Sequence, residues 1–300
     1  MNESDLIPVT NLQPAPDLTR ENPMIWTGEE QPVGVFLDAG ETDDALALLG
    51  MPALQQPATP RLPIDFTPGP LLRARLQQLR EAVKTAATGG EGQLLDMVEL
   101  DSDSRQALLE MLGEGEVSGS VTLDEVQYSI VESVLPGVWH LTGSDGNEYL
   151  EVAAIPSVIT RAAGSLRTAP IPLPEAGPGI MNGLALLAEI NEHAASWHPG
   201  IEHNRVLNFT LLPTSVADQQ LLIDVLGRAE LVLDSGGFGN CRVMATTVRH
   251  VWAVQYVNGM GKTIMDTIEI GRIPDAAIAA SQDLEDSSGR LAEILDTYLV

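Results

Sequence analysis

Apolar residues recur at every third or fourth position over residues 70–88, and two glycines at 89–90 end the pattern. This spacing predicts an amphipathic helix. A second helix is expected to end at Gly113, which can adopt positive φ, because Asp101 and Ser102 offer N-cap oxygens ahead of a run of apolar residues, Ala107, Leu108, Met111 and Leu112. The folded part of the chain is therefore expected to begin with a pair of helices.

Extended segments lie on both sides of the second helix. One strand is expected over 94–100, and three or four consecutive strands follow the helix. Apolar side chains fall on alternate positions over 126–134, as in a half-buried strand. The Asp145-Gly146 pair between residues 138–141 and 149–155 is a strong hairpin signal. Consecutive strands joined by tight turns run antiparallel, so this half predicts a mainly antiparallel sheet.

The same order of elements returns after a proline-rich stretch. The second set comprises a helix over 181–190, a strand over 206–212, a helix from Ser215 to Gly227, and strands over 251–257 and 263–270. When the two sets are aligned, Gly113 falls on Gly227, Glu116 on Glu230, Val138-Trp139 on Val251-Trp252 and Ile155-Pro156 on Ile273-Pro274. These coincidences predict an internal duplication: an α+β fold of two half-domains, each with two helices and a mainly antiparallel sheet, related by a pseudo-twofold axis.

The predicted organisation has four parts. Residues 1–69 form an acidic, proline-rich, partly ordered arm, since the first 70 residues hold 11 of the 20 prolines and 11 acidic residues against two basic ones. Residues 70–160 form the first repeat, 161–178 a stiff proline-rich linker, and 179–300 the second repeat with a C-terminal helix. The arm carries short apolar islands that are long enough to dock on another surface.

Composition limits the classes of partner. The 300 residues carry 42 Asp+Glu against 16 Lys+Arg, a net charge of −26, which disfavours nucleic acids and anionic lipids and favours basic or metal-bearing partners. The lone cysteine excludes a disulfide framework and a cluster held by cysteines alone. No run of 18 apolar residues and no signal-like start is present, so a cytoplasmic protein without membrane insertion is expected.

Two patterns are weak evidence for chemistry. Residues 259–263 read Gly-Met-Gly-Lys-Thr, like the end of a phosphate-binding loop, but Tyr256 stands where the motif needs glycine, and the strands on either side favour a hairpin turn. His193, His198 and His203 recur every five residues, a step that does not place them on one helical face. A loop with solvated histidines is the favoured interpretation of that segment, with a metal site as the alternative.

The segment from Ser235 to Arg242 is the most distinctive in the chain. Its glycines permit positive φ or the close approach of a partner, and Arg242 beside Cys241 could lower the thiol pKa. The opposite interpretation, a buried cysteine beside a glycine bulge, is favoured. The candidate site residues lie here and in the corresponding place of the first half: Gly113, Glu114, Gly115, Glu116, Gly237, Phe238, Gly239, Asn240, Cys241 and Arg242.

On these two segments, and on Val251-Trp252-Ala253-Val254-Gln255-Tyr256 leading to Ile268-Glu269-Ile270 and Ile273-Pro274, the sequence resembles the HupH/HyaF/HoxQ-type hydrogenase expression and formation proteins. The resemblance spans about residues 70–300. It implies an accessory chaperone for the maturation of uptake [NiFe]-hydrogenase, acting on the precursor of the iron–sulfur small subunit before export and on its twin-arginine signal peptide, alongside other hydrogenase accessory proteins.

The resemblance implies no catalytic residue, no resident cofactor and no metal ligand. The alternative function from a different class is a metal- or thiol-dependent enzyme that uses the His193/His198/His203 segment or Cys241. A third hypothesis is a structural adaptor whose acidic arm recruits another maturation factor.

Overall fold

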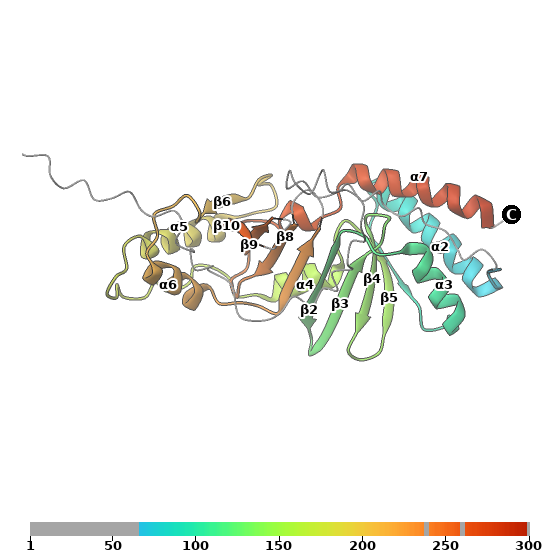
Figure 1. Cartoon of the computed structure of the whole chain (residues 1–300), viewed down its shortest axis with the longest axis horizontal. Helices are drawn as coiled ribbons and strands as arrows, with labels where there is room; N and C mark the ends of the chain where they lie inside the picture. The colour runs from blue at the N-terminus through green and yellow to red at the C-terminus, as the bar shows by residue number, and fades with distance from the viewer. Residues whose placement is uncertain (1–65, 237–239, 259–261, 299–300) are drawn as a thin grey trace, which may run out of the picture.

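The computed structural model describes residues 66–236, 240–258 and 262–298 (Figure 1). The helices are α2 (Pro70–Ala87), α3 (Ser102–Leu112), α4 (Ser157–Ser165), α5 (Gly183–Ser196), α6 (Val216–Leu226), the 3-10 turn η1 (Asp275–Ala277) and α7 (Ser281–Tyr298). The strands are β1 (Gln93–Asp96), β2 (Val117–Leu123), β3 (Val126–Glu132), β4 (Val138–Gly143), β5 (Glu148–Val152), β6 (Arg205–Asn208), β7 (Leu231–Ser235), β8 (Asn240–Ala245), β9 (Val251–Val257) and β10 (Thr263–Ile270). Nearly all of the predicted acidic arm lies outside the described residues.

The strands form one ten-stranded sheet in the order β1-β5-β4-β3-β2-β7-β8-β9-β10-β6, and every neighbouring pair is antiparallel. The α+β class and the antiparallel sheet are therefore confirmed. Outward from the central β2–β7 pair, the two sides present their strands in the same chain order. We call β1–β5 with α2 and α3 the first half, and β6–β10 with α5 and α6 the second half.

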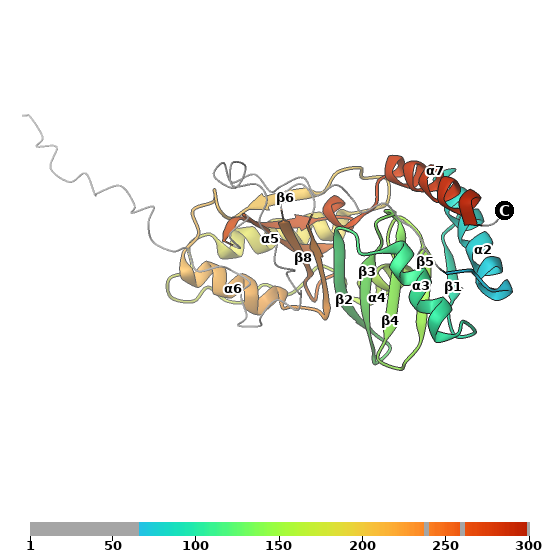
Figure 2. The ribbon, with the colours of Figure 1, turned by 45° about the vertical axis from the view of Figure 1, so that its right-hand side comes forward.

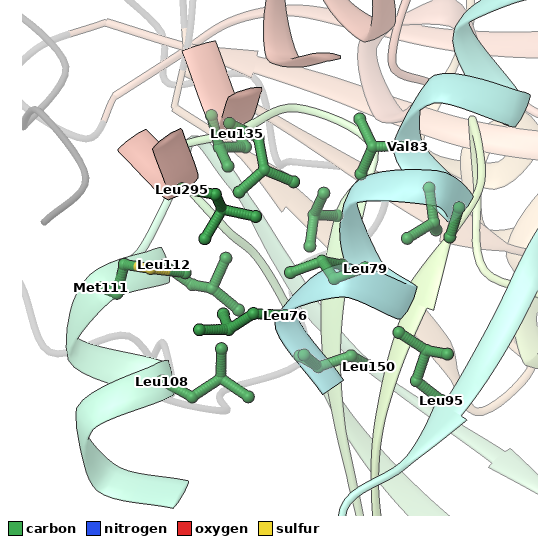
Figure 3. Close-up of a cluster of buried hydrophobic side chains, with 14 of the residues drawn as sticks. Leu76, Leu79, Val83, Leu95, Leu108, Met111, Leu112, Leu135, Leu150 and Leu295 are labelled. Atoms are coloured by element: carbon green, nitrogen blue, oxygen red, sulfur yellow. The ribbon is translucent and has the colours of Figure 1, made fainter. Parts of the chain in front are cut away.

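Helices cover the two ends of one sheet face and the centre of the other (Figures 1 and 2). The first core lies among α2, α3, α7 and strands β1, β4 and β5, and the leucines of Figure 3 belong to it. The second core lies beneath α5 and α6. Because successive strand residues point to opposite faces, Val138 enters the first core while Trp139 enters a third core on the other face, covered by α4 and η1.

The segment that follows each half's last strand packs partly against the opposite half. After β10, α7 reaches the first half, where Leu291 and Leu295 join its core and Arg290 donates to the carbonyl of Val134 at 3.1 Å. After β5 and α4, the chain reaches the second half, where Arg167 N–H donates to Thr247 O at 3.1 Å and Ile171 is buried. Each half therefore depends on a segment that follows the other half's sheet.

The predicted linker differs in detail from the observed chain. Residues 161–165 are the last part of α4, which packs against β2 and β7, and Ile171 is a core residue rather than an exposed spacer. Proline-rich composition does not report such packing, because it describes backbone stiffness and not the apolar contacts of a single isoleucine.

Several strands are shorter than their apolar runs. The run 94–100 leaves the sheet at Asp96, whose Oδ1 accepts from Val98 N at 2.7 Å and turns the chain. In the second half, Asn208 Oδ1 accepts from Thr210 N at 3.0 Å and ends β6 in the same way. The return strand expected over 149–155 ends at Val152. The predicted bounds of β9 and β10 match the structure.

Asp218 joins the two helices of the second half. Its buried carboxylate accepts hydrogen bonds from the backbone N–H groups of Met181, Asn182 and Gly183 at 2.7–3.1 Å and from that of Ser215 at 2.9 Å. Burial alone would raise the pKa of this carboxyl, but the four N–H donors outweigh it and hold the pKa at about 2. The N-termini of α5 and α6 are thereby tied to one charged group.

No helix in the described part of the chain is long and apolar enough to cross a bilayer.

Candidate functional site

The two glycine-rich segments that the sequence singles out meet at one end of the central β2–β7 pair. Val117 at the start of β2 pairs with Ser235 at the end of β7, and Gly236 N–H donates to the carbonyl of Glu116 at 2.7 Å. The antiparallel junction of the halves therefore places residues 113–116 beside Gly236. Gly237, Phe238 and Gly239 lie outside the described residues.

The first segment is held by backbone contacts that glycine permits. Gly113 has φ of 58° and its N–H donates to Leu109 O at 2.8 Å, which ends α3. Gly115 N–H donates to Glu132 O at 2.6 Å, and a Cβ at position 115 would overlap the carbonyl oxygen of Ser133. Glu114 and Glu116 are exposed. The segment therefore presents two carboxylates on a backbone that is pinned at both ends.

Arg242 lies on the sheet face that carries the helices of both halves, in a row of paired residues that crosses the sheet. Its Nε and Nη2 donate to the two carboxylate oxygens of Asp234 at 2.7 and 3.1 Å. Strand pairing continues the row from Asp234 to Ser118 on β2 and from Arg242 to Gln255 on β9. Ser118 is exposed, whereas the Nε2 of the buried Gln255 has no hydrogen-bond partner among the described residues. Asn240, at the start of the same strand, is half-buried.

Cys241 points to the opposite face and enters the third core. Burial, with smaller contributions from Glu269 and Asp234, raises the pKa of its thiol to about 11. The expectation that Arg242 lowers this pKa is therefore wrong, because neighbours along a strand point to opposite faces and the guanidinium is engaged by Asp234. The buried-cysteine interpretation is the one that the structure supports.

Glu132 is a residue of this site that the sequence reasoning missed. It is buried, its Oε1 accepts from Gly137 N at 2.9 Å, and its carbonyl receives Gly115 N–H. Burial is the main cause that raises the pKa of its carboxyl to about 7, and the charges of Glu116 and Asp283 act in the same direction. The sequence could have indicated this burial, because alternation along β3 places Glu132 on the same face of the strand as the buried Ile130.

The histidine segment does not converge. His193 belongs to α5, with its Nε2 3.9 Å from Glu189 Oε1, whereas His198 and His203 follow the helix and are exposed. Within residues 66–236, 240–258 and 262–298, no group of three or more His, Cys, Asp or Glu side chains could hold a metal ion. Residues 259–261 of the loop-like Gly-Met-Gly-Lys-Thr motif lie outside the described residues, and the flanking β9 and β10 pair with each other.

Comparison with known proteins gives consistent matches. Residues 180–298 match the C-terminal conserved region of the HupH hydrogenase expression protein. The chain is 38% identical over 229 residues to the hydrogenase expression/formation protein HupH of Rhizobium leguminosarum bv. viciae, covering 74% of this chain and 80% of that one. It is also 38% identical to HoxQ of Cupriavidus necator, covering 73% and 79%. With the hydrogenase-1 operon protein HyaF of Escherichia coli K12, it shares 31% identity over 68% and 73%.

Among solved structures, the hydrogenase expression protein HupH from Thiobacillus denitrificans is 23% identical, with a TM-score of 0.34, and the match covers 40% of this chain and 97% of that one.

Proposed function

The chain belongs to the HupH family of hydrogenase expression and formation proteins, and from this premise we propose that it is a non-catalytic chaperone in hydrogenase maturation. The proposed client is the precursor of the iron–sulfur small subunit of an uptake [NiFe]-hydrogenase, held in the cytoplasm before export. The observation that carries the proposal is 38% identity to a hydrogenase expression/formation protein across 80% of its length.

The geometry at the end of the β2–β7 pair supports a binding role. Residues 114–116 and Gly236 are exposed, and glycines let a partner backbone approach closely. Glu114 and Glu116 add negative charge that would orient a basic client. We therefore propose that this junction, with Asn240 and Arg242 beside it, is the client-binding region.

The chemistry of these groups favours binding over catalysis. The thiol of Cys241 is buried and has a pKa of about 11, so it stays protonated at neutral pH and is a poor nucleophile. The guanidinium of Arg242 is engaged in two hydrogen bonds to the carboxylate of Asp234. The thiol-dependent alternative therefore has no support from the geometry.

The two halves are proposed to descend from one duplicated unit and to be related by a pseudo-twofold axis. The shared strand order supports this, and so do matched details: Ser133 Oγ donates to Leu135 O at 2.9 Å, and Thr246 Oγ1 donates to Val248 O at 3.1 Å. Under this proposal the binding region lies near the axis and draws residues from both halves.

The test is co-purification from cells that accumulate the small-subunit precursor, using the full chain. We expect the precursor to co-purify, and to do so less well as salt rises. The double variant Glu114→Gln/Glu116→Gln should lower recovery several-fold. Glu230→Gln is the matched control, because Glu230 holds the corresponding exposed position before β7 and its carbonyl accepts from Thr122 N at 2.8 Å.

Failure to recover the precursor, with or without its signal peptide, would contradict the proposed client. Equal losses in the double variant and in Glu230→Gln would contradict the proposed region while leaving the client in place. Deleting residues 1–65 in a parallel experiment separates a contribution of the acidic arm from that of the sheet.

A further inference from the structure

The sheet ends in two edge strands, β1 and β6, that hold corresponding places in the two halves. An edge strand presents backbone N–H and C=O groups that can pair with an added strand. The two edges differ in charge and in how many of their outward backbone groups are already hydrogen-bonded. This difference indicates what the β1 edge would bind.

The register shows which backbone groups of β1 face away from the sheet. Met97 N–H donates to Glu148 O at 3.1 Å, and bonds to one neighbouring strand recur at every second residue. The backbone groups of Leu95 and Gln93 therefore face β5, while those of Leu94 and Asp96 face away from the sheet. At β6, by the same argument from Phe209 N–H and Asp266 O, Val206 and Asn208 face outward.

The outward groups of β6 are partly used already. The carbonyl of Asn208 accepts from Leu211 N at 3.2 Å and from Leu212 N at 3.1 Å. In the first half the corresponding bond goes elsewhere, since Leu100 N–H donates to Met97 O at 3.1 Å. Within the described part of the chain, the turn after β1 therefore leaves the carbonyl of Asp96 open to an added strand.

Charge separates the two edges more sharply. Between Lys84 and Arg105 the chain has no basic residue and five exposed acidic ones: Glu91, Asp96, Glu99, Asp101 and Asp103. The corresponding stretch around β6, residues 197–216, has one acidic residue, the exposed Glu202, and contains Arg205, which pairs with Glu189 at 2.7 Å. Opposite charge favours encounter and orientation, so the β1 edge suits a basic partner and the β6 edge does not.

Apolar contact is available at the β1 edge as well. Leu94 is 56% exposed and Val98 is 59% exposed, and both flank the outward backbone of Asp96. We propose that the free edge of β1 binds an extended, basic polypeptide segment with alternating aliphatic side chains, which adds an eleventh strand to the sheet. Backbone pairing would supply affinity, and the aliphatic and acidic side chains would supply specificity. The proposal rests on the proposed function only in that the client would provide this segment.

The test uses the full chain and a labelled synthetic peptide of alternating arginine and valine. Leu94→Pro removes an outward N–H while keeping the bonds to β5, a change that edge strands tolerate. It should weaken peptide binding by ~tenfold or more. Val206→Pro, the same change at the matched edge, should leave binding unchanged. Circular dichroism and thermal unfolding of both variants verify the fold.

A second set of variants tests charge without altering the backbone. Asp96→Asn keeps the Oδ1 that accepts from Val98 N, as Asn208 does in the second half. Combined with Glu91→Gln and Glu99→Gln, it should weaken the peptide several-fold and flatten the salt dependence of binding. A peptide of alternating glutamate and valine should not bind.

Equal effects of the two proline variants, or no effect of Leu94→Pro, would overturn the proposal. So would protection of Val206 rather than Leu94 from hydrogen exchange on peptide binding, or concentration-dependent dimers that Leu94→Pro abolishes, since these indicate pairing with a second copy. Precursor co-purification is scored separately: peptide binding without precursor recovery contradicts the proposed function and keeps this proposal, and the reverse result contradicts only this proposal.

Discussion

The two ends of the central β2–β7 pair carry different connections. At one end a two-residue turn, Asp124-Glu125, joins β2 to β3, both residues have positive φ, and Arg161 contacts Asp124 at 3.0 Å. At the other end the connection from Ser235 to Asn240 is longer in sequence and glycine-rich, and its described residue Gly236 donates to the carbonyl of Glu116. The two halves share one strand order, but the glycine-rich segments lie at one end of the central pair only.

The largest expected effect tests how far the halves depend on each other. A chain that ends at residue 280 loses α7, and with it the buried Leu291 and Leu295 of the first core. Losing two such leucines should cost about 4 kcal/mol or more, enough to unfold the first half. Denaturant unfolding followed by circular dichroism measures this. A truncated chain that keeps the full transition would show that α7 adds little.

Removal of a buried charge in the second half should have the next largest effect. Asp218→Ala leaves the N–H groups of Met181, Asn182, Gly183 and Ser215 without their shared acceptor. We expect a loss of about 3 kcal/mol in the free energy of unfolding. Ser104, at the corresponding position of α3, makes a single side-chain bond to Asp101, at 2.8 Å, so Ser104→Ala should cost only about 1 kcal/mol. Similar losses in the two variants would contradict the special role of Asp218.

Glu132 provides a pH-dependent contrast, because the paired position in the second half is Ala245, which does not titrate. Burial raises the pKa of Glu132 from 4.5 to about 7, so the native state binds more protons than the unfolded state between these values and stability falls as pH rises through them. Glu132→Gln removes this dependence.

The variant should therefore match the wild type near pH 5 and be more stable by about 1–3 kcal/mol at pH 8. Thermal unfolding at the two pH values, with Glu230→Gln as an exposed control, measures the difference. A gain that is equal at both pH values would contradict the assigned cause.

The smallest expected effect concerns which side chain donates a hydrogen bond to a backbone carbonyl, a tryptophan in the first half and a histidine in the second. In the first half Trp139 Nε1 donates to Ala153 O at 2.8 Å, beside Gly137 with φ of 82°. In the second half His250 adopts φ of 66°, its Nδ1 lies 3.2 Å from Gly271 O, and Trp252 Nε1 has no partner among the described residues.

His250→Gly should release the carbonyl of Gly271 for the indole of Trp252. Relief of the positive φ and loss of the imidazole contacts oppose each other, so stability should change by less than about 1 kcal/mol. The readout is a shift in tryptophan fluorescence, with Arg249→Ala as a neighbouring control. An unchanged spectrum would show that the indole finds no new acceptor.

Sequence periodicity predicted the helices and strands well where their buried apolar side chains recur at a regular spacing. The helix from Pro70, a cap at Asp101 or Ser102, a cap at Ser215 and the strands β9 and β10 all depend on local spacing and capping chemistry, which the sequence displays directly. The early ends of β1 and β6 were missed because they depend on a side chain that bonds two residues ahead, at Asp96 and Asn208.

Long-range features were less accessible. The sequence placed both glycine-rich segments among the candidate residues, but it could not show that Gly236 and Glu116 pair, because that contact depends on the order of strands in the sheet. It also could not show that Asp234 engages Arg242 while Cys241 faces the core. The crossing of α7 to the first half depends on the same long-range topology.

The most direct test of the proposed function is the affinity of the purified full chain for the purified small-subunit precursor over a range of salt concentrations. We expect saturable binding that weakens steadily as salt rises, and that is weaker in Glu114→Gln/Glu116→Gln but not in Glu230→Gln. Absence of binding at low salt, with both proteins folded, would contradict the proposed function.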